Sequence, residues 1–332
     1  MGIRTGQKLK MLYIADILKK YSDEDHPINA TEICDKLASF GVTAERKAVY
    51  DDIEQLTTYG YDIIKTRMPR NGFFMASREL ELPEIFLLCD AVKAANFISS
   101  KKSRELINKL EGMLSIYETS VSGKVYFDSD GKTKNEELFY SVDTLNRAIK
   151  ERKKIQCKYM VRELSVGKEI GFKIRNMKIS PYALTWQDDH YYLIGNYEKY
   201  DNLIHMRIDR MKTVEMLDES RRDFSEVCEY KDTFDVADYV KRLFGMYGGK
   251  SDLITLKCSK KIFESMLDKF SENVSITNVT DDSFCITASA IVSEALVTFI
   301  MNYGSQIKVV EPEYLKKMVT DKAQEVLSVY SD

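Results

Sequence analysis

The spacing of hydrophobic residues in the first quarter of the chain is helical. A stripe of apolar side chains at helical spacing predicts an amphipathic helix over 8–21. A second helix is predicted to begin near Asn29 or Thr31, because either side chain can cap a helix, and to end at Gly41. A third helix is predicted over 43–59, where a glycine again follows the last apolar position.

A hairpin is predicted directly after the third helix. The segment YDIIKTRMPRNGFFM (61–75) has the pattern of two short strands around a turn at 69–72, and its Asn-Gly pair is a strong hairpin signal. Three helices followed by a hairpin are typical of a winged helix-turn-helix, which reads DNA with its third helix. The hydrophobic pattern therefore predicts a DNA-binding domain over 1–78.

The spacing of apolar residues stays largely helical up to about residue 150 and then changes to the alternation typical of strands. Apolar residues line one side of 83–117 and predict helix, whereas SVSGKVYFDSDGKTKN (120–135) predicts a loop or linker. A further helix is predicted over 136–150. Beyond it apolar and polar residues alternate, which favours antiparallel strands in a small barrel or sandwich. The predicted strands cover 154–160, 169–186, 189–197 and 202–216.

The last third of the chain alternates strand and helix. A helical linker is predicted over 236–244, and GMYGGK (245–250) is predicted to be a flexible joint. The order β-α-β-β-α-β, followed by one more helix, then favours a ferredoxin-like fold over 251–332. Taken together, the elements predict an α+β multidomain protein.

Composition narrows the class of protein without changing this picture. A chain of 332 residues with 44% hydrophobic content is long enough for two or three domains. We expect a cytoplasmic protein without membrane contact, because no apolar run has the length of a membrane span or a signal peptide. The six cysteines are scattered, so we expect them to be reduced and largely buried. The net charge of −3 leaves room for a local basic face.

Basic and aromatic residues cluster where a winged helix-turn-helix meets DNA. Apolar residues of the third helix fall in one narrow arc, so its first turns can present polar side chains outward. The wing between residues 65 and 78 contains four basic residues and no acidic one. The acidic Asp51 and Glu54 oppose DNA if they face phosphate. The predicted DNA-contacting residues are Thr43, Arg46, Lys47, Tyr50, Lys65, Arg67, Arg70 and Asn71, and Arg78 completes the basic wing.

Three segments of the chain resemble the WYL-domain transcription regulators. ISPYALTWQDDHYYLIGNYEKYDNLIHMRIDRM (179–211) is similar to the family signature of a Pro-aromatic pair, a Trp-Tyr-Leu tripeptide and an Arg-x-Asp-Arg element. ERKAVYDDIEQL (45–56) resembles the recognition helix that such proteins carry. IKVVEPEYLKKMV (307–319) resembles the C-terminal extension that follows their WYL domain.

This resemblance implies a domain order and a sensory role. The WYL domain of the family is a small Sm-like β-barrel thought to sense a ligand, in some members a nucleotide or single-stranded nucleic acid. The implied organisation is a winged helix-turn-helix (1–78), a helical linker and dimerisation region (79–135), a WYL barrel (136–220), a linker (221–250) and a ferredoxin-like extension domain (251–332).

The resemblance also implies an effector site. Tyr191 stands where the family usually has Trp, and Ile204 where a further Arg often occurs. Strand alternation sends His190 and Tyr192 to one face and Tyr191 and Leu193 to the other, and in a regular strand it also separates the two arginines. Packing of these aromatics in a barrel core remains the alternative. The implied effector-binding residues are Tyr182, His190, Tyr191, Tyr192, Leu193, His205, Arg207 and Arg210.

The sequence offers little for other classes of function. It has three histidines without metal-ligand spacing and no phosphate-binding glycine loop, so we expect neither catalysis, nor a metal, nor a cofactor. The predicted partners are double-stranded DNA, a nucleotide or single-stranded effector and a second copy of the chain, because one recognition helix reads a short site. The alternative is a protein–protein interaction module that uses the winged helix to contact a partner.

Overall fold

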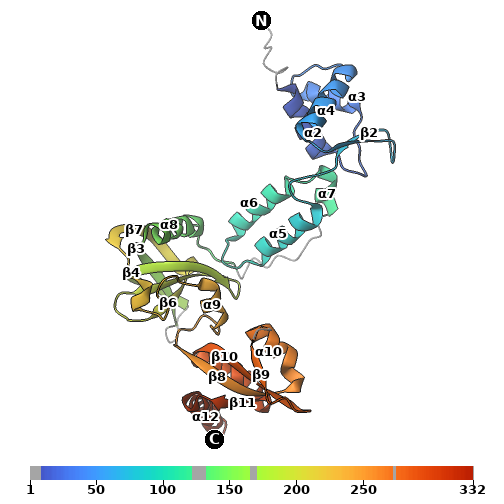
Figure 1. Ribbon diagram of the computed structural model, residues 1–332. Coiled ribbons are helices and arrows are strands. Elements are labelled where there is room, and N and C mark those ends of the chain that lie inside the picture. Colours follow the sequence, from blue (N-terminus) through green and yellow to red (C-terminus); the bar gives the residue numbers. More distant parts are fainter. Residues whose placement is uncertain (1–8, 122–131, 165–169, 272–273, 332) are drawn as a thin grey trace. The chain divides into compact units, whose positions relative to one another are not determined.

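The computed structural model describes residues 9–121, 132–164, 170–271 and 274–331 (Figure 1). The chain divides into two compact units, Met1–Lys134 and Asn135–Asp332. The predicted loop over 120–135 lies mostly outside the described residues. The fold is a mixture of helices and sheets, so the predicted α+β multidomain class is confirmed.

The described part of the first unit begins with the three helices that the hydrophobic pattern predicts. They are α2 (Lys10–Tyr21), α3 (Ala30–Ser39) and α4 (Arg46–Tyr59). The side chain of Asn29 accepts the N–H groups of Thr31 and Glu32, and Glu32 returns the contact to the Asn29 N–H. Asn29 rather than Thr31 is therefore the cap of α3.

A two-stranded hairpin completes this domain. Strand β1 (Ile63–Thr66) pairs with β2 (Gly72–Met75), and the Asn-Gly pair lies at the end of the connecting turn. All four residues of β2 are buried. A bridge between Ile28 and Phe73 also ties the hairpin to the segment before α3. The predicted three helices and hairpin are confirmed, and α4 begins at Arg46 instead of Thr43.

Three helices follow the hairpin where a single helical stretch was predicted. They are α5 (Leu82–Ala94), α6 (Ser100–Glu111) and α7 (Ile116–Val121). The first break has no glycine or proline to mark it. Instead the side chain of Ser99 accepts the N–H of Lys102 and starts a new helix. Ile85, Cys89 and Leu114 form the small core of this helical region.

The second unit opens with α8 (Leu138–Glu151) and a five-stranded antiparallel sheet. In Figure 1 α8 lies beside β7, and residues of the two elements are in contact. The strand order is β6-β5-β4-β3-β7. The strands are β3 (Lys153–Leu164), β4 (Ile170–Gln187), β5 (His190–Tyr197), β6 (Leu203–Arg207) and β7 (Met211–Ser220).

The connection between β6 and β7 forces this sheet to curl. A single 3-10 turn (Ile208–Arg210) joins these two strands, although they are the two edges of the sheet. The backbone from Arg207 to Met211 spans at most about 14 Å. The edges of a flat five-stranded sheet would lie about 19 Å apart. The sheet therefore rolls up, as an Sm-like barrel requires.

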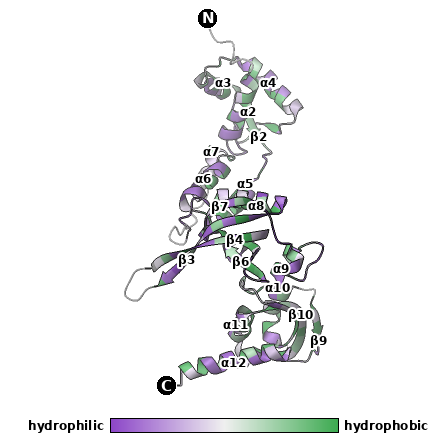
Figure 2. Ribbon diagram, turned by 90° about the vertical axis from the view of Figure 1, so that its left-hand side faces the viewer, coloured by the Kyte–Doolittle hydropathy of each residue, from purple (hydrophilic) through white to green (hydrophobic). Residues whose placement is uncertain are grey.

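The remaining sheet has the strand order of a ferredoxin-like fold. Its order is β11-β8-β10-β9, and all its pairs are antiparallel. Only Leu315 of its last helix is buried, and hydrophobic residues continue along that helix to its far end (Figure 2). The elements are β8 (Lys250–Ser259), α10 (Phe263–Phe270), β9 (Ser275–Thr277), β10 (Ser283–Val292), α11 (Glu294–Asn302), β11 (Ile307–Glu311) and α12 (Glu313–Val329).

The segment between the two sheets is packed, which differs from the predicted flexible joint. Val227, Leu243 and Met246 are buried against the barrel, on either side of the short helix α9 (Val236–Lys241). A Cβ atom at Gly249 would come within 2.0 Å of the carbonyl oxygen of Val292. The glycines of 245–250 therefore permit close backbone packing as well as sharp turns.

Candidate nucleic-acid interface and effector site

The first turns of α4 present the side chains expected to meet DNA. Val49, Ile53 and Leu56 are buried in the core of the domain. Arg46, Lys47 and Tyr50 are exposed, and residues three or four positions apart share one helix face. The exposed Thr43 precedes the helix. These residues therefore form a polar surface at the N-terminal end of α4, where the helix dipole favours an anion.

The wing meets this surface through Lys65 and Tyr50. The Lys65 Nζ lies 5.4 Å from the centroid of the Tyr50 ring and 5.9 Å from that of Phe73. The Tyr50 ring packs edge-on against Phe73, with 5.5 Å between centroids. Phe73 is buried in the domain core, so it fixes the position of both neighbours. The structure thus brings a predicted wing residue and a predicted helix residue together.

Arg70 is held back by contacts within the domain. Its Nε donates to the carbonyl oxygen of Pro27 at 2.7 Å, and its Nη1 donates to Glu32 at 2.9 Å. Arg67 and Asn71 flank it on the turn and are exposed. Some of the Arg70 N–H donors therefore connect the wing to the start of α3 and are not available to DNA.

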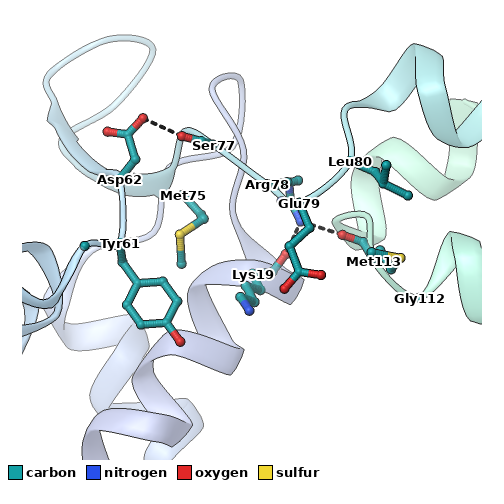
Figure 3. Close-up of a pocket in the computed structure, with 11 residues that line it drawn as sticks. Lys19, Tyr61, Asp62, Met75, Ser77, Arg78, Glu79, Leu80, Gly112 and Met113 are labelled. Atoms are coloured by element: carbon teal, nitrogen blue, oxygen red, sulfur yellow. Dashed lines mark hydrogen bonds between the residues drawn. The ribbon is translucent and has the colours of Figure 1, made fainter.

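Arg78, the fourth basic residue of the wing, has a structural role (Figure 3). Its guanidinium donates to the carbonyl oxygens of Lys19, Ser22 and Met113 at 2.8–3.0 Å, and its side chain is only 10% exposed. A neighbouring cavity of about 450 Å³ is lined by residues of the same region, including Tyr61. Arg78 thus fastens the winged helix-turn-helix to the helices that follow it.

The acidic residues of α4 differ in whether they form an ion pair within the domain. Asp52 lies 2.7 Å from the Lys10 Nζ, in an ion pair whose partners are both 15% exposed. Asp51 and Glu54 are exposed on the helix. The negative charge that remains on the surface of α4 therefore lies beyond its first turn.

In the barrel, strand β5 is covered on both faces. Leu193 and Ile194 point to opposite sides of the sheet, yet both are fully buried. Ile194 packs against Val227 and Tyr239 of the segment that follows the barrel. A residue in the middle of β5 therefore faces a core whichever side it points to.

Three of the predicted effector residues are part of these cores. Leu193 is fully buried. The Tyr182 hydroxyl donates to the carbonyl oxygen of Arg222 at 3.0 Å, and its ring packs in the cluster around Ile194. His205 is hydrogen-bonded to the Tyr239 hydroxyl at 3.0 Å, and burial lowers its pKa to about 4. Their geometry is that of packing residues.

Four other predicted residues gather at the start of β5 and at the turn after β6. Tyr192 is the direct cross-strand partner of Arg207, and the ring centroids of His190 and Tyr192 are 6.3 Å apart. Arg207 binds Asp209 with two hydrogen bonds of 3.0 and 2.7 Å. Burial lowers the pKa of His190, and the positive charge of Arg207 adds to that shift.

The 3-10 turn explains why Arg207 and Arg210 both lie near Tyr192. A regular strand would separate Arg207 and Arg210, but the turn at Ile208–Arg210 interrupts the alternation between them. Burial raises the pKa of Tyr192, and the charges of both arginines oppose that shift. Burial also raises the pKa of Tyr159, and the positive charge of Arg210 opposes that shift.

The sequence analysis did not predict Tyr159 as a member of this cluster, and it placed Tyr191 on the face of β5 opposite to Tyr192. Tyr159 belongs to β3 and pairs with Met211 at the beginning of β7. An aromatic residue in the strand KIQCKYM was its only signal. Tyr191 pairs with Trp186 across β4 and β5, and neighbouring strand positions point to opposite faces. Tyr191 and Tyr192 therefore lie on different sides of the sheet.

The cysteines and acidic residues form neither a disulfide nor a group of metal ligands in the described part of the chain. All six cysteines are free, and four of them are buried. Across the described ranges no three His, Cys, Asp or Glu side chains come together as metal ligands. None of the helices placed in the structure is both long and apolar enough to cross a membrane.

Comparison with family models identifies both domains of the second unit. The WYL domain model matches residues 141–216, and the WCX domain model matches residues 252–327. The chain thus carries a WYL domain followed by a WCX domain. These matches confirm the resemblance to the WYL-domain family over the two matched ranges. No curated protein matches the chain.

Comparison with solved structures finds proteasome accessory factor B/C (PafBC) of Arthrobacter aurescens. The two chains share 16% sequence identity and align with a TM-score of 0.28. The alignment covers 97% of this chain and 49% of that chain, so this chain spans about half the length of the structure it matches.

Proposed function

We propose that this protein is a transcriptional regulator that binds double-stranded DNA through α4 and the wing. One observation carries the proposal: Arg46, Lys47 and Tyr50 are exposed on the first turns of α4, and Lys65 of the wing lies over the Tyr50 ring. Cationic side chains at the N-terminal end of a recognition helix, beside a basic wing, suit contacts to phosphates and to base edges.

Salt-dependent binding of the full chain to a duplex tests this proposal. We expect wild-type affinity for a random-sequence duplex to fall steeply between 50 and 200 mM salt. Lys47→Ala and Lys65→Ala should each weaken binding about fivefold and lower the log–log salt slope by about 1, because each removes one phosphate contact. Lys317→Ala, on the exposed surface of α12, is the control for net charge and should change neither value. Absence of duplex binding at low salt would refute the proposal and favour a protein partner.

We further propose that the WYL barrel binds an anionic, aromatic effector, either a nucleotide or a short single strand, and that this changes DNA binding. The sensor cluster consists of Tyr159, His190, Tyr192, Arg207 and Arg210. Two guanidinium groups beside aromatic rings can bind phosphate and stack on bases. Asp209 neutralises only one of the two positive charges.

Thermal stabilisation by such ligands tests the effector site. We expect nucleotides or short oligonucleotides to raise the melting temperature of the wild-type chain, because a ligand that binds only the folded state stabilises it. Arg207→Ala and Arg210→Met should abolish this rise. Arg162→Met removes an exposed charge from β3 of the same barrel and should preserve it. Unchanged melting of the wild type with all of these probes would leave the cluster without a ligand role.

We also propose a cytoplasmic homodimer, since two recognition helices read a longer DNA site than one. Exposed apolar residues support two candidate surfaces. Leu87 on α5 is 74% exposed, and Leu327 and Val329 at the end of α12 are 65% and 68% exposed. Light scattering should give a mass of about twice the 38.4 kDa of one chain. A monomeric mass at the concentrations that bind DNA would contradict the dimer.

A further inference from the structure

The residues that connect the two units are anchored at both ends by buried polar side chains. On the side of the first unit, the Lys132 ammonium donates to the carbonyl oxygens of Val92 and Ala95 at the end of α5, at 3.1 and 2.7 Å. The N–H of Thr133 donates to Asn96 at 2.8 Å. Lys132 is only 6% exposed, so a buried cation here satisfies the last carbonyls of a helix.

The other end of the segment is anchored at the 3-10 turn Ile208–Arg210. The Asn135 side-chain amide donates to the carbonyl oxygens of Asp209 and Met211, at 3.0 and 2.8 Å. Its oxygen accepts the N–H of Glu137, and the Glu137 carboxylate accepts the N–H of Thr213 at 3.0 Å. Asn135 is only 6% exposed. Its side chain is therefore fixed at three points.

The two carbonyls that Asn135 holds flank Arg210. Asp209 belongs to the turn and Met211 directly follows it, so Asn135 contacts the backbone on both sides of a residue of the sensor cluster. Only Thr133 and Lys134 separate this anchor from Lys132 along the chain. A displacement of the turn therefore pulls on a short stretch of backbone whose other end is fixed to α5.

We propose that residues 132–137 are a transmission segment that couples the Arg207–Arg210 turn to the end of α5, with Asn135 and Lys132 as its two positioning residues. The role rests on the proposed function, in which an anion bound by Arg207 and Arg210 competes with Asp209 for the Arg207 guanidinium. Loss of that ion pair shifts the turn and its carbonyls. The segment carries the shift to the helices that Arg78 fastens to the winged helix-turn-helix.

Hydrogen exchange of the full chain tests the segment without any ligand. Asn135→Asp keeps the oxygen that caps Glu137 but removes both N–H donors to the turn. We expect faster exchange in residues 207–214 and, on the far side of the segment, about threefold faster exchange in residues 92–99, in line with coupling energies of 0.5–2 kcal/mol. Asn196→Asp is the matched control, because Asn196 is a buried amide that donates to Tyr200 and Asn202 in the same barrel. It should leave residues 92–99 unchanged.

The reciprocal variant makes the test independent of how well Asn135→Asp folds. Lys132→Met should speed exchange in residues 92–99 and, about threefold, in residues 207–214, because coupling between two sites is mutual. Its control is Lys269→Met, which removes a half-buried ammonium from the Leu243 carbonyl elsewhere in the second unit. A change confined to the mutated side, in either variant, would overturn the proposal. Unchanged melting of the wild type with nucleotides and short oligonucleotides would instead refute the proposed effector binding, so the two failures are distinguishable.

Discussion

The winged helix-turn-helix and the WYL barrel expose their predicted site residues to very different extents. In α4 the side chains expected at the surface, Arg46, Lys47 and Tyr50, are exposed. In the barrel, Tyr182 and Leu193 were expected to contact an effector, yet they are 6% and 0% exposed. The predicted residues of α4 therefore lie at the surface, whereas these two predicted residues of the barrel lie in a core.

The difference follows from how many faces of each element are covered. A surface helix packs along one stripe, so every residue outside that stripe reaches solvent. Strand β5 has the barrel interior on one side and the segment around Val227 and Tyr239 on the other. Alternation separates two faces of a strand, but it does not show which face is open. Along β5, the partly exposed side chains lie at its two ends, at His190–Tyr192 and at Tyr197.

The largest expected effect concerns the buried centre of β5. Leu193→Ala should lower the free energy of unfolding of the barrel by about 2–5 kcal/mol, because it removes a fully buried side chain and leaves a cavity. Trp186, the one tryptophan of the chain, lies in β4 and reports this unfolding by its fluorescence in urea. Leu164→Ala, at a position that is 79% exposed, is the control and should stay within about 0.5 kcal/mol of wild type. Equal effects would mean that Leu193 is not core.

A pH titration tests the burial of His205, another residue that was predicted to bind the effector. Burial lowers its pKa to about 4 from the ordinary 6.5. The unfolded chain takes up this proton near pH 6.5, whereas the folded chain resists it until about pH 4. Stability is therefore lost as the pH falls between these values, by at most about 3 kcal/mol. Urea unfolding followed at Trp186 should show this loss, and His205→Gln should flatten it. A wild-type stability that stays constant from pH 7 to pH 4.5 would show that His205 is accessible to protons.

The smallest expected effect separates two basic residues of the wing. Arg70→Ala should weaken duplex binding by less than twofold, because Arg70 already donates to Pro27 and Glu32. Its ion pair with Glu32 is partly exposed, so its loss should cost the fold less than about 1 kcal/mol. Duplex titrations of Arg70→Ala and Lys65→Ala under the same conditions compare the two. A larger loss for Arg70→Ala would place the turn of the wing, not its strand, at the DNA.

Much of the fold could be predicted because the residues that begin and end its helices and turns act locally. Asn29 caps α3, Gly60 ends α4, and the Asn-Gly pair marks the hairpin. The ferredoxin-like strand order followed from the alternation of periods alone. The packing of 221–250 against the barrel could not be predicted, because glycines that permit close backbone contact look the same in a sequence as glycines in a flexible joint.

The sensor cluster was predictable only in part. The 3-10 turn at Ile208–Arg210 has no glycine or proline. Its one sequence signal is that the apolar Ile208 and Met211, both buried, are three positions apart, whereas strand alternation puts residues of one face two positions apart. Without the turn, Arg207 and Arg210 belong on opposite faces, and Tyr159 has no reason to join them. Cross-strand neighbours such as these depend on register, which a single sequence does not specify.

Hydrogen exchange of the full chain with and without duplex DNA tests the central claim most directly. Binding through α4 and the wing should slow amide exchange in residues 43–50 and 63–73, and should leave residues 252–327 of the WCX domain unchanged. Lys65→Ala should reduce the protection of both segments together, since Lys65 lies over Tyr50. Protection confined to the WYL or WCX domain would contradict the account, because it would place the DNA on a surface other than the winged helix-turn-helix.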